Sequence, residues 1–247
     1  MPPTPRPTER SSAVDDDRRP APASRVPALL CAVLCALVFG LLLTLVALRW
    51  EPLMAVDRAL AGALHRTAVA APGWTRLNRV LSDWLWDPWM MRVVLVAAVV
   101  LLVRRGERLL GGWVAATALV GTGLQQVLKA AVGRARPVWP DPVDAAHYAA
   151  FPSGHAMSAL IAGALVLWSL CRCGARSLWR WTAGAVAVVS VVGVGFTRVY
   201  LGVHWLSDVV GGWLLGGALV AAAAAAYTGY AHRPEGNGAA RWAGWRS

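Results

Sequence analysis

The sequence predicts an all-α protein, a bundle of about six helices that cross a membrane. Of the 247 residues, 57% are hydrophobic and only 15% are charged, and long apolar runs alternate with short polar segments. A soluble globular protein carries about 25% charged residues, so this composition favours a membrane protein. The 14 tryptophans fit the same class, because indole rings gather where a membrane meets water.

The apolar runs define the expected elements in chain order. The first, about Val26–Leu48, is too long for the core of a signal peptide and long enough to cross a bilayer, which takes roughly 20 residues. Further spans are expected at about 89–103, 109–130, 154–171, 179–197 and 208–230. The termini, residues 1–25 and 231–247, are expected to be disordered cytoplasmic tails.

Residues 49–88, between the first two spans, mix apolar and charged residues at helical spacing. Leu53, Val56, Leu60 and Leu64 form one apolar stripe. The segment is therefore expected to form amphipathic helices that lie at the outer membrane interface. A soluble loop packed on the bundle is the alternative. Residues 26–88 thus combine the first span with these helices, and residues 89–230 form the core.

Arginine clusters predict the orientation. Clusters at 104–108 and 172–180 and in the C-terminal tail are expected on the cytoplasmic side, which also places both termini there. The connections after the third and fifth spans then face outward. Those connections also carry cations, which the positive-inside rule does not predict for outward-facing segments. A functional site would explain these cations. The net charge of +11 does not indicate nucleic-acid binding, because no basic run is interleaved with stacking aromatic residues.

Polar residues gather at span ends that share the outer face. Lys129, the one lysine in a chain with 24 Lys and Arg, closes the third span, and the stretch Ser153-Gly154-His155 opens the fourth. Arg198 closes the fifth span, and His204 and Asp208 begin the sixth. Because successive spans cross the membrane in opposite directions, the ends of the third and fifth spans and the starts of the fourth and sixth lie at the same face. The topology therefore predicts one site built from four distant segments.

Phosphate is the ligand that these residue types favour. Lys129, Arg136 and Arg198 supply three cations, and guanidinium groups match phosphate oxygens well. Ser153 and Gly154 lie at a helix start, where free backbone N–H groups bind anions.

Two histidines suggest catalysis at that phosphate. His204 and Asp208 are four residues apart, so they share a helical face, and the carboxylate can fix the tautomer of a nucleophilic imidazole. His155 could protonate the leaving oxygen. No metal or other cofactor is expected, because between Glu107 and Glu235 the only acids are Asp141, Asp144 and Asp208, too few for a two-metal site.

Three sequence motifs resemble the signatures of the type 2 phosphatidic acid phosphatase family. They are "KAAVGRARP" (129–137), "FPSGH" (151–155) and "TRVYLGVHWLSD" (197–208), and the resemblance covers about residues 89–230. That family includes bacterial undecaprenyl-diphosphate phosphatases and shares its core with vanadium haloperoxidases, so the resemblance implies a haloperoxidase-like phosphatase core.

The resemblance also implies roles for residues of the motifs. His204 would attack phosphorus to give a phosphohistidine, Asp208 would orient it, and His155 would act as the acid, without a metal. Phosphate binding falls to five residues: Lys129, Arg136, Ser153, Gly154 and Arg198.

The expected function is hydrolysis of a lipid phosphate at the outer face of the membrane. Polyprenyl diphosphate, phosphatidate and phosphatidylglycerol phosphate all fit, and the oligomeric state stays open. Two alternatives remain: transfer of the group to an alcohol acceptor, and a phospholipid-binding or transport protein without turnover. Arg134 lies in the first motif but outside its required positions, so its role is also open. His147, Asp141 and Asp144 are read as solvated loop residues, and His65 and His232 as surface residues.

Overall fold

The computed structural model describes residues 25–231, and every regular element in this range is helical. The prediction of an all-α fold is confirmed. The expected disordered tails lie outside the described residues, apart from Arg25 and Ala231 at their edges. The elements are α1 (Val26–Ala47), α2 (Glu51–Ala70), α3 (Pro72–Val80), the π-helical turn η1 (Leu81–Leu85), α4 (Pro88–Arg104), α5 (Arg108–Val132), α6 (Gly154–Arg172), α7 (Ser177–Tyr200) and α8 (Leu206–Ala231).

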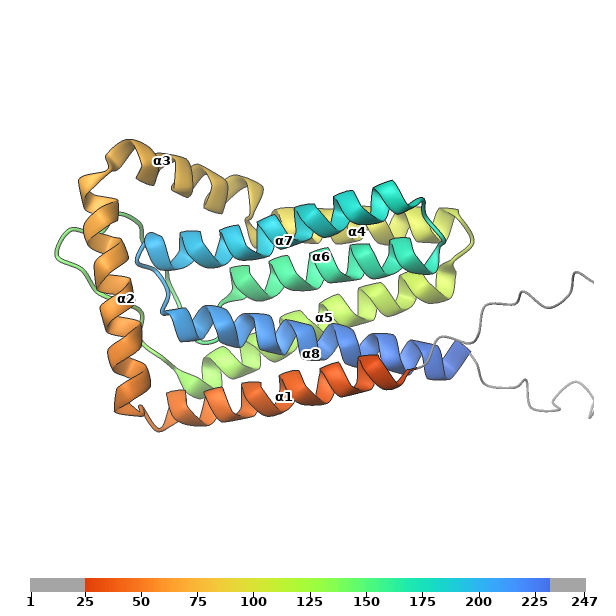
Figure 1. Cartoon of the computed structure of the whole chain (residues 1–247), viewed down its shortest axis with the longest axis horizontal. Helices are drawn as coiled ribbons and strands as arrows, with labels where there is room; N and C mark the ends of the chain where they lie inside the picture. Colours follow the sequence, from red (N-terminus) through yellow and green to blue (C-terminus); the bar gives the residue numbers. More distant parts are fainter. Residues whose placement is uncertain (1–24, 232–247) are drawn as a thin grey trace, which may run out of the picture.

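Six long helices run side by side, and α2 crosses one end of the bundle (Figure 1). Helix α6 is central, because it packs against α4, α7 and α8, while α1 covers the other side of α8. The outward faces of α1 and α7 are apolar, with exposed Leu34, Leu37 and Val189 among them. Apolar residues that face outward are what a lipid environment requires of a spanning helix.

Five helical segments in the described range are long and apolar enough to cross a membrane. They are α1, the stretch Pro72–Arg104 that contains α4, and α6, α7 and α8. Each of the six expected spans exists as a helix, but α5 is not in this group. Its glycines, its threonines and the pair Gln125-Gln126 make it less apolar, and it still lies along the bundle (Figure 1).

The end of the bundle beside α2 holds four helix ends. Helices α5 and α7 finish there, and α6 and α8 begin there, as the alternation of directions predicted (Figure 1). Short turns at 105–107 and 173–176 close the opposite end. The segment 133–153 and the turn 201–205 therefore meet beneath α2.

Helix α2 packs on this end with an unexpected face. The predicted stripe is wrong in one position, because Val56 is 54% exposed while Asp57, Ala61 and His65 are buried. A helix that covers loops and helix ends contacts backbone and polar groups, so small and polar residues form its inner face. Helices were correctly expected here.

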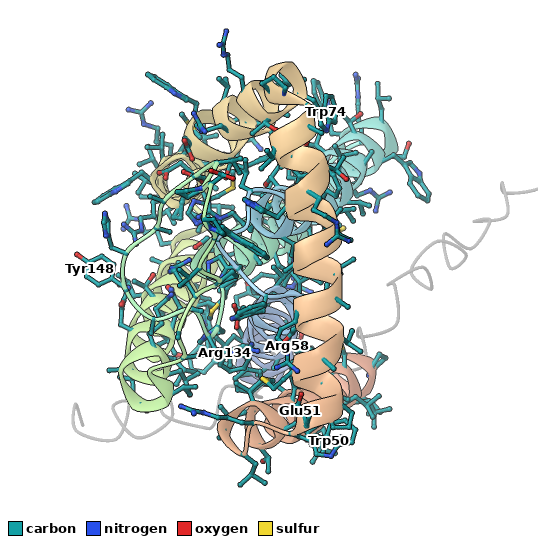
Figure 2. The ribbon with its side chains drawn as sticks, turned by 90° about the vertical axis from the view of Figure 1, so that its left-hand side faces the viewer. Trp50, Glu51, Arg58, Trp74, Arg134 and Tyr148 are labelled. Atoms are coloured by element: carbon teal, nitrogen blue, oxygen red, sulfur yellow. The ribbon has the colours of Figure 1, made fainter. Side chains whose placement is uncertain are left out.

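Aromatic residues support this placement of α2 in two ways. His65 stacks on Trp139 with 4.2 Å between ring centroids, so its assignment to the surface was also wrong. Trp50 and Trp74 lie near the two ends of α2 and are about half exposed (Figure 2). Exposed indoles at both ends are typical of a helix at a membrane interface.

Two glycines let α8 approach the start of α6 closely. A Cβ atom on Gly211 would lie 2.6 Å from the Phe151 ring, and one on Gly212 would lie 2.6 Å from the carbonyl oxygen of Ser153. The amide of Ser153 also donates to the carbonyl of Asp208 at 2.9 Å. The beginning of α8 is therefore held directly against the beginning of α6.

Candidate active site

A cavity of about 560 Å³ opens at the α2 end of the bundle. Six of the eight predicted site residues line it: Lys129, Arg136, Gly154, His155, Arg198 and His204. The other two, Ser153 and Asp208, are fully buried next to residues of this lining. The structure thus brings all eight residues together from α5, α6, α7, α8 and two connecting segments.

His204 and Asp208 form a buried pair. Nδ1 of His204 lies 3.2 Å from Oδ2 of Asp208, and neither side chain is more than 1% exposed. His204 lies in the turn before α8, and its amide donates to the carbonyl of Arg198. The carboxylate accepts a second bond from the amide of Trp205, at 2.9 Å. Asp208 thereby holds the proton on Nδ1 and leaves the lone pair of Nε2 directed at the cavity.

The charge state of His204 suits a nucleophile. Burial lowers the pKa of His204 well below its ordinary value of 6.5, and nearby positive charges, above all Arg136 and Arg198, lower it further. The imidazole is therefore neutral at neutral pH. Nη1 of Arg136 lies 3.1 Å from Nε2, as expected when Nε2 accepts a hydrogen bond. A phosphoryl oxygen that approaches Nε2 meets the same guanidinium.

Backbone carbonyls hold Arg136 in place. Nε donates to the carbonyl of Tyr148 at 2.9 Å, and Nη1 donates to that of Val203 at 2.6 Å. Burial lowers the pKa of Arg136 below its ordinary value, while the negative charge of Asp208 opposes this change. A guanidinium stays charged in proteins, so Arg136 presents a fixed cation to the cavity.

Lys129 and Arg198 are anchored in a similar way. Nζ of Lys129 donates to the carbonyl of Ala149 at 2.5 Å, which leaves two of its three N–H donors for a ligand. Arg198 is only 4% exposed, and its Nη1 donates to Oγ of Ser82 in η1 at 2.8 Å. Asp144 lies 3.9 Å from the same atom, so it is an ion-pair partner and not the solvated loop residue expected from the sequence.

Two buried polar atoms at this site lack a partner among residues 25–231. They are Oγ of Ser153 and Nε of Arg198. A buried polar group without a hydrogen bond is costly, so such atoms indicate a ligand. Both lie where the cations and the N-terminus of α6 converge, and an anion with several oxygens would satisfy them.

His155 lines the cavity from the first turn of α6. Its Nε2 lies 3.9 Å from Oδ2 of Asp87, the residue that caps α4 by accepting from the amide of Trp89. The two groups form an ion pair only when the imidazole is protonated. The two histidines therefore approach one cavity from different segments, one paired with Asp208 and the other near Asp87.

The sequence did not lead us to predict a polar network that lies behind His204 and Asp208. Arg134 donates to Oδ1 of Asp208 at 2.6 Å, to Oγ of Ser207 at 2.6 Å and to Oδ2 of Asp57 at 2.7 Å. The amide of Ser207 donates to the other oxygen of Asp57, at 3.0 Å. An available signal was the helical spacing of Asp57, Ala61 and His65, which places an acid on one face with small and aromatic residues.

The described residues contain no group of three or more His, Cys, Asp or Glu side chains arranged to hold a metal ion. The donors that line the cavity are cations, hydroxyls and amides, which suit an anion.

Comparison with known proteins gives the family. Residues 110–231, from α5 to the end of α8, match the model of the PAP2 superfamily. The chain belongs to the PAP2 superfamily. The matched range contains all eight predicted site residues. The resemblance to type 2 phosphatidic acid phosphatases is thereby confirmed.

Two named proteins are similar in sequence to this PAP2 protein. An undecaprenyl-diphosphatase of Sulfolobus acidocaldarius is 28% identical over 149 residues, 57% of this chain and 62% of the relative. Phosphatidylglycerophosphatase B of Bacillus subtilis is 36% identical over 98 residues, 38% of this chain and 46% of the relative. The alignments thus span less than two thirds of either relative.

A solved structure shares the fold. The crystal structure of a transmembrane PAP2-type phosphatidylglycerolphosphate phosphatase from Bacillus subtilis superposes with a TM-score of 0.69 at 24% identity. The match covers 78% of this chain and 94% of that chain. The PAP2 fold therefore includes helices outside the range of the family model.

Proposed function

We propose that this PAP2 protein is a multi-pass membrane phosphatase that hydrolyses a phosphomonoester or diphosphate of a lipid through a phosphohistidine, without a metal. One observation carries the proposal. A neutral imidazole nitrogen, Nε2 of His204, faces a cavity that also presents Lys129, Arg136 and Arg198. Phosphoryl transfer needs little beyond an aligned nucleophile and stabilised charge on the phosphoryl oxygens.

In the first step, Nε2 of His204 attacks phosphorus and an N–P bond forms. The bond from phosphorus to the leaving oxygen breaks, and that oxygen takes its electron pair and a proton from His155. The imidazole becomes positively charged at this stage, and Asp208 stabilises it through Nδ1. The cations and Oγ of Ser153 neutralise the phosphoryl oxygens.

In the second step, water replaces His204. His155, which has now lost a proton, accepts one from the water as the water oxygen bonds to phosphorus. The N–P bond breaks, its electron pair returns to Nε2, and orthophosphate leaves. Both histidines end in their starting protonation states, so the cycle closes without a cofactor.

The membrane setting supports a lipid substrate. The cavity lies at the bundle end that carries the interfacial helix α2, within reach of headgroups. The arginine clusters at 104–108 and 172–180 lie at the other end, so the positive-inside rule favours an outward-facing site and cytoplasmic termini. The names of the two relatives add polyprenyl diphosphate and phosphatidylglycerol phosphate as candidate substrates beside phosphatidate.

Phosphate release from purified protein in detergent tests the proposal. Wild type, His204→Ala and His147→Ala are compared on the three lipid classes with EDTA present. His147 is an exposed histidine of the same cavity lining, so its variant is the matched control. We expect wild type and His147→Ala to release orthophosphate, and His204→Ala to lose at least about 10³-fold in kcat, as for other catalytic nucleophiles.

A covalent intermediate gives a second readout. Substrate labelled in its terminal phosphate should transfer an acid-labile label to wild type but not to His204→Ala. Addition of glycerol separates hydrolysis from transfer, because a transferase would form glycerol phosphate. Full activity in His204→Ala, or no release from any lipid by wild type, would overturn the proposal.

A further inference from the structure

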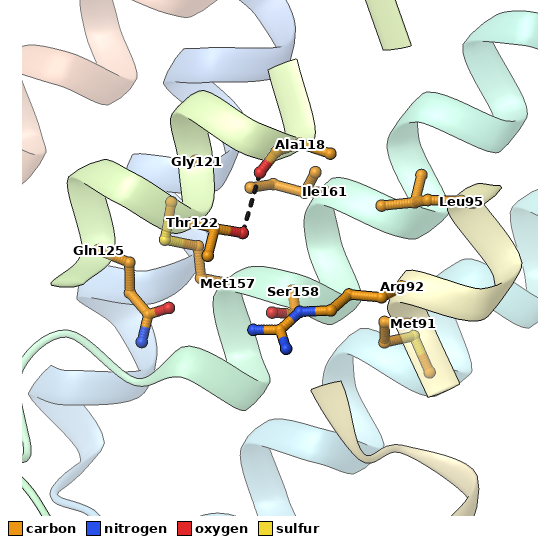
Figure 3. A pocket seen from close by; sticks show the side chains of 10 residues that line it. All are labelled: Met91, Arg92, Leu95, Ala118, Gly121, Thr122, Gln125, Met157, Ser158 and Ile161. Atoms are coloured by element: carbon orange, nitrogen blue, oxygen red, sulfur yellow. Dashed lines mark hydrogen bonds between the residues drawn. The ribbon is translucent and has the colours of Figure 1, made fainter. Parts of the chain in front are cut away.

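A narrow crevice between α4, α5 and α6 adjoins the phosphate cavity (Figure 3). Three residues line both spaces: Arg92, Gln125 and Ser158. Beyond them the wall is apolar and includes Leu95, Met157 and Ile161. The crevice holds about 30 Å³, so it is too small for a second headgroup.

Arg92 is unusual at this junction. It is the fifth residue of α4, is partly buried, and reaches toward Ser158 on α6 (Figure 3). Its guanidinium lies 4.5 Å from the centre of the Trp89 ring. Among residues 25–231 it forms no ion pair with a carboxylate and no hydrogen bond. A cation in a spanning helix without a protein counter-ion is expensive and marks a place where an anion binds.

The direction of a bound lipid places Arg92 between its two parts. The reacting phosphoryl lies at His204 with Lys129, Arg136 and Arg198. The lipid chain has to leave this cavity toward the bilayer, and the apolar side chains that line the crevice begin where the cavity ends, on the side of α4 and α5. Arg92 stands where the two spaces join.

We propose that Arg92 binds a second phosphate group of the substrate, the one between the reacting phosphoryl and the lipid chain. This proposal rests on the proposed lipid phosphatase function and narrows its substrates to lipids with two phosphates. Such a group is present in a lipid diphosphate and in a phosphatidylglycerol phosphate, and absent from single-phosphate lipids. Gln125 and Ser158 offer neutral hydrogen-bond donors to the same group, and a guanidinium binds phosphate oxygens in pairs.

Two matched pairs of lipids test the proposal. The first is a polyprenyl diphosphate and its monophosphate, and the second is phosphatidylglycerol phosphate and phosphatidate. Arg92→Gln is compared with wild type and with Arg104→Gln, the same change at the opposite end of α4. We expect Arg92→Gln to lower kcat/KM for a two-phosphate lipid by about 10- to 100-fold, as loss of charge-assisted hydrogen bonds does. The single-phosphate partner should change by less than about threefold.

The lipid pair in which Arg92→Gln lowers kcat/KM for the two-phosphate member alone identifies the source of the second phosphate. Equal losses on both members of each pair would overturn the proposal, because Arg92 would then serve the reacting phosphate or the fold. No loss on any lipid would overturn it too, because Arg92 would then only contact the membrane. Arg92→Lys should recover part of the lost preference, since it keeps the charge but not the planar donors.

A binding measurement keeps this test independent of turnover. Orthophosphate and pyrophosphate are titrated into the full-length His204→Ala protein with and without Arg92→Gln. We expect Arg92→Gln to weaken pyrophosphate binding by about tenfold and to leave orthophosphate binding unchanged. Equal effects on both anions would overturn the proposal. If wild type hydrolyses nothing but this difference is found, the proposed function fails and the second-phosphate site stands.

Discussion

Arg134 and Asp57 form a buried ion pair, 2.7 Å long, between the segment after α5 and the helix that crosses the end of the bundle. The same guanidinium donates to Asp208, the partner of His204. A single arginine therefore links α2 to the His204–Asp208 pair. Because the two carboxylates are almost fully buried, Arg134 supplies the positive charge that makes their burial tolerable.

Arg134→Lys should impair the chemical step more than substrate binding. A lysine ammonium cannot donate through two fixed branches to carboxylates on two elements, so Asp208 loses its alignment. We expect kcat to fall by about 10- to 100-fold with little change in KM, since Arg134 does not line the phosphate cavity. Steady-state kinetics on the preferred lipid would measure this.

The control is Arg58→Lys, which alters an exposed pair with Glu51 on the same helix. Exposed pairs contribute about 0–1 kcal/mol, so activity should be retained. Arg134→Ala leaves two buried carboxylates unpaired. It should lower the free energy of unfolding by about 3–5 kcal/mol, and the melting temperature should fall with it. An Arg134→Lys protein with wild-type kcat would contradict the positioning role.

Gly212→Ala should disturb the site from the α8 side. The new methyl group would lie 2.6 Å from the carbonyl oxygen of Ser153, so α8 has to move away from the start of α6. We expect kcat/KM to fall at least about tenfold and the protein to melt earlier, because overpacking costs about 1–3 kcal/mol. Thermal denaturation and lipid phosphatase assays would measure both effects.

The matched change is Gly123→Ala in α5, where a Cβ atom meets nothing within 4 Å. Alanine is the better helix former by about 1 kcal/mol, so this variant should be as stable as wild type or more stable. If the two variants behave alike, the close approach at Gly212 is not what positions the site.

His204 should stay neutral through mildly acidic pH. Nitrogen NMR of protein labelled at histidine, with His204→Gln for assignment, should show its imidazole unprotonated from pH 8 to well below 6.5, since burial lowers its pKa. A titration centred near pH 6.5 would contradict the buried geometry of the pair.

The lowered pKa of His204 also predicts how the stability of the protein depends on pH. The folded pKa of His204 is lower than the unfolded value, so unfolded chains bind more protons below pH 6.5. Neutral His204 therefore contributes fully above that pH, and its contribution falls by up to about 1.4 kcal/mol for each unit below it. The melting temperature of wild type should decline more steeply from pH 7 to 5.5 than that of His204→Gln.

Ser82→Ala should weaken phosphate binding through Arg198. The hydroxyl of Ser82 is buried and accepts from Nη1 of Arg198, so its loss frees this guanidinium to shift. We expect KM and the inhibition constant of orthophosphate to rise by about three- to tenfold, the equivalent of one hydrogen bond, with a smaller effect on kcat. Ser169→Ala removes a buried hydroxyl bonded to Leu165 within α6 and should leave both constants unchanged. Identical constants for Ser82→Ala and wild type would contradict this role of Ser82.

Much of the fold and the site could be predicted from the sequence. Apolar runs of bilayer length predicted the spanning helices, because a helix in lipid satisfies its own backbone and shows its length directly in the sequence. Alternating helix direction then predicted that Lys129, Ser153, Arg198 and His204 meet at one end. Both inferences depend on local pattern and on counting crossings, and neither needs a packing angle.

Contacts between elements were beyond this reasoning. Leu53, Leu60 and Leu64 of the predicted stripe of α2 pack against core residues, but Val56 is exposed. The buried polar residues Asp57 and His65 of α2 were not predicted. Hydrophobic periodicity predicts a face only where the neighbour is apolar, and α2 covers helix ends and loops. Likewise, Asp144, in the segment between α5 and α6, turned out to contact Arg198.

The sequence by itself determined the helices, their order and the residues that line the candidate site, since these follow from periodicity and from motifs at helix ends. Only the tertiary structure decided which groups support them. Asp57 lies 77 positions before Arg134, and Ser82 lies 116 positions before Arg198. Such pairs depend on how α2 and η1 fold back over the bundle. That geometry arises from the packing of whole helices, and no single stretch of sequence records it.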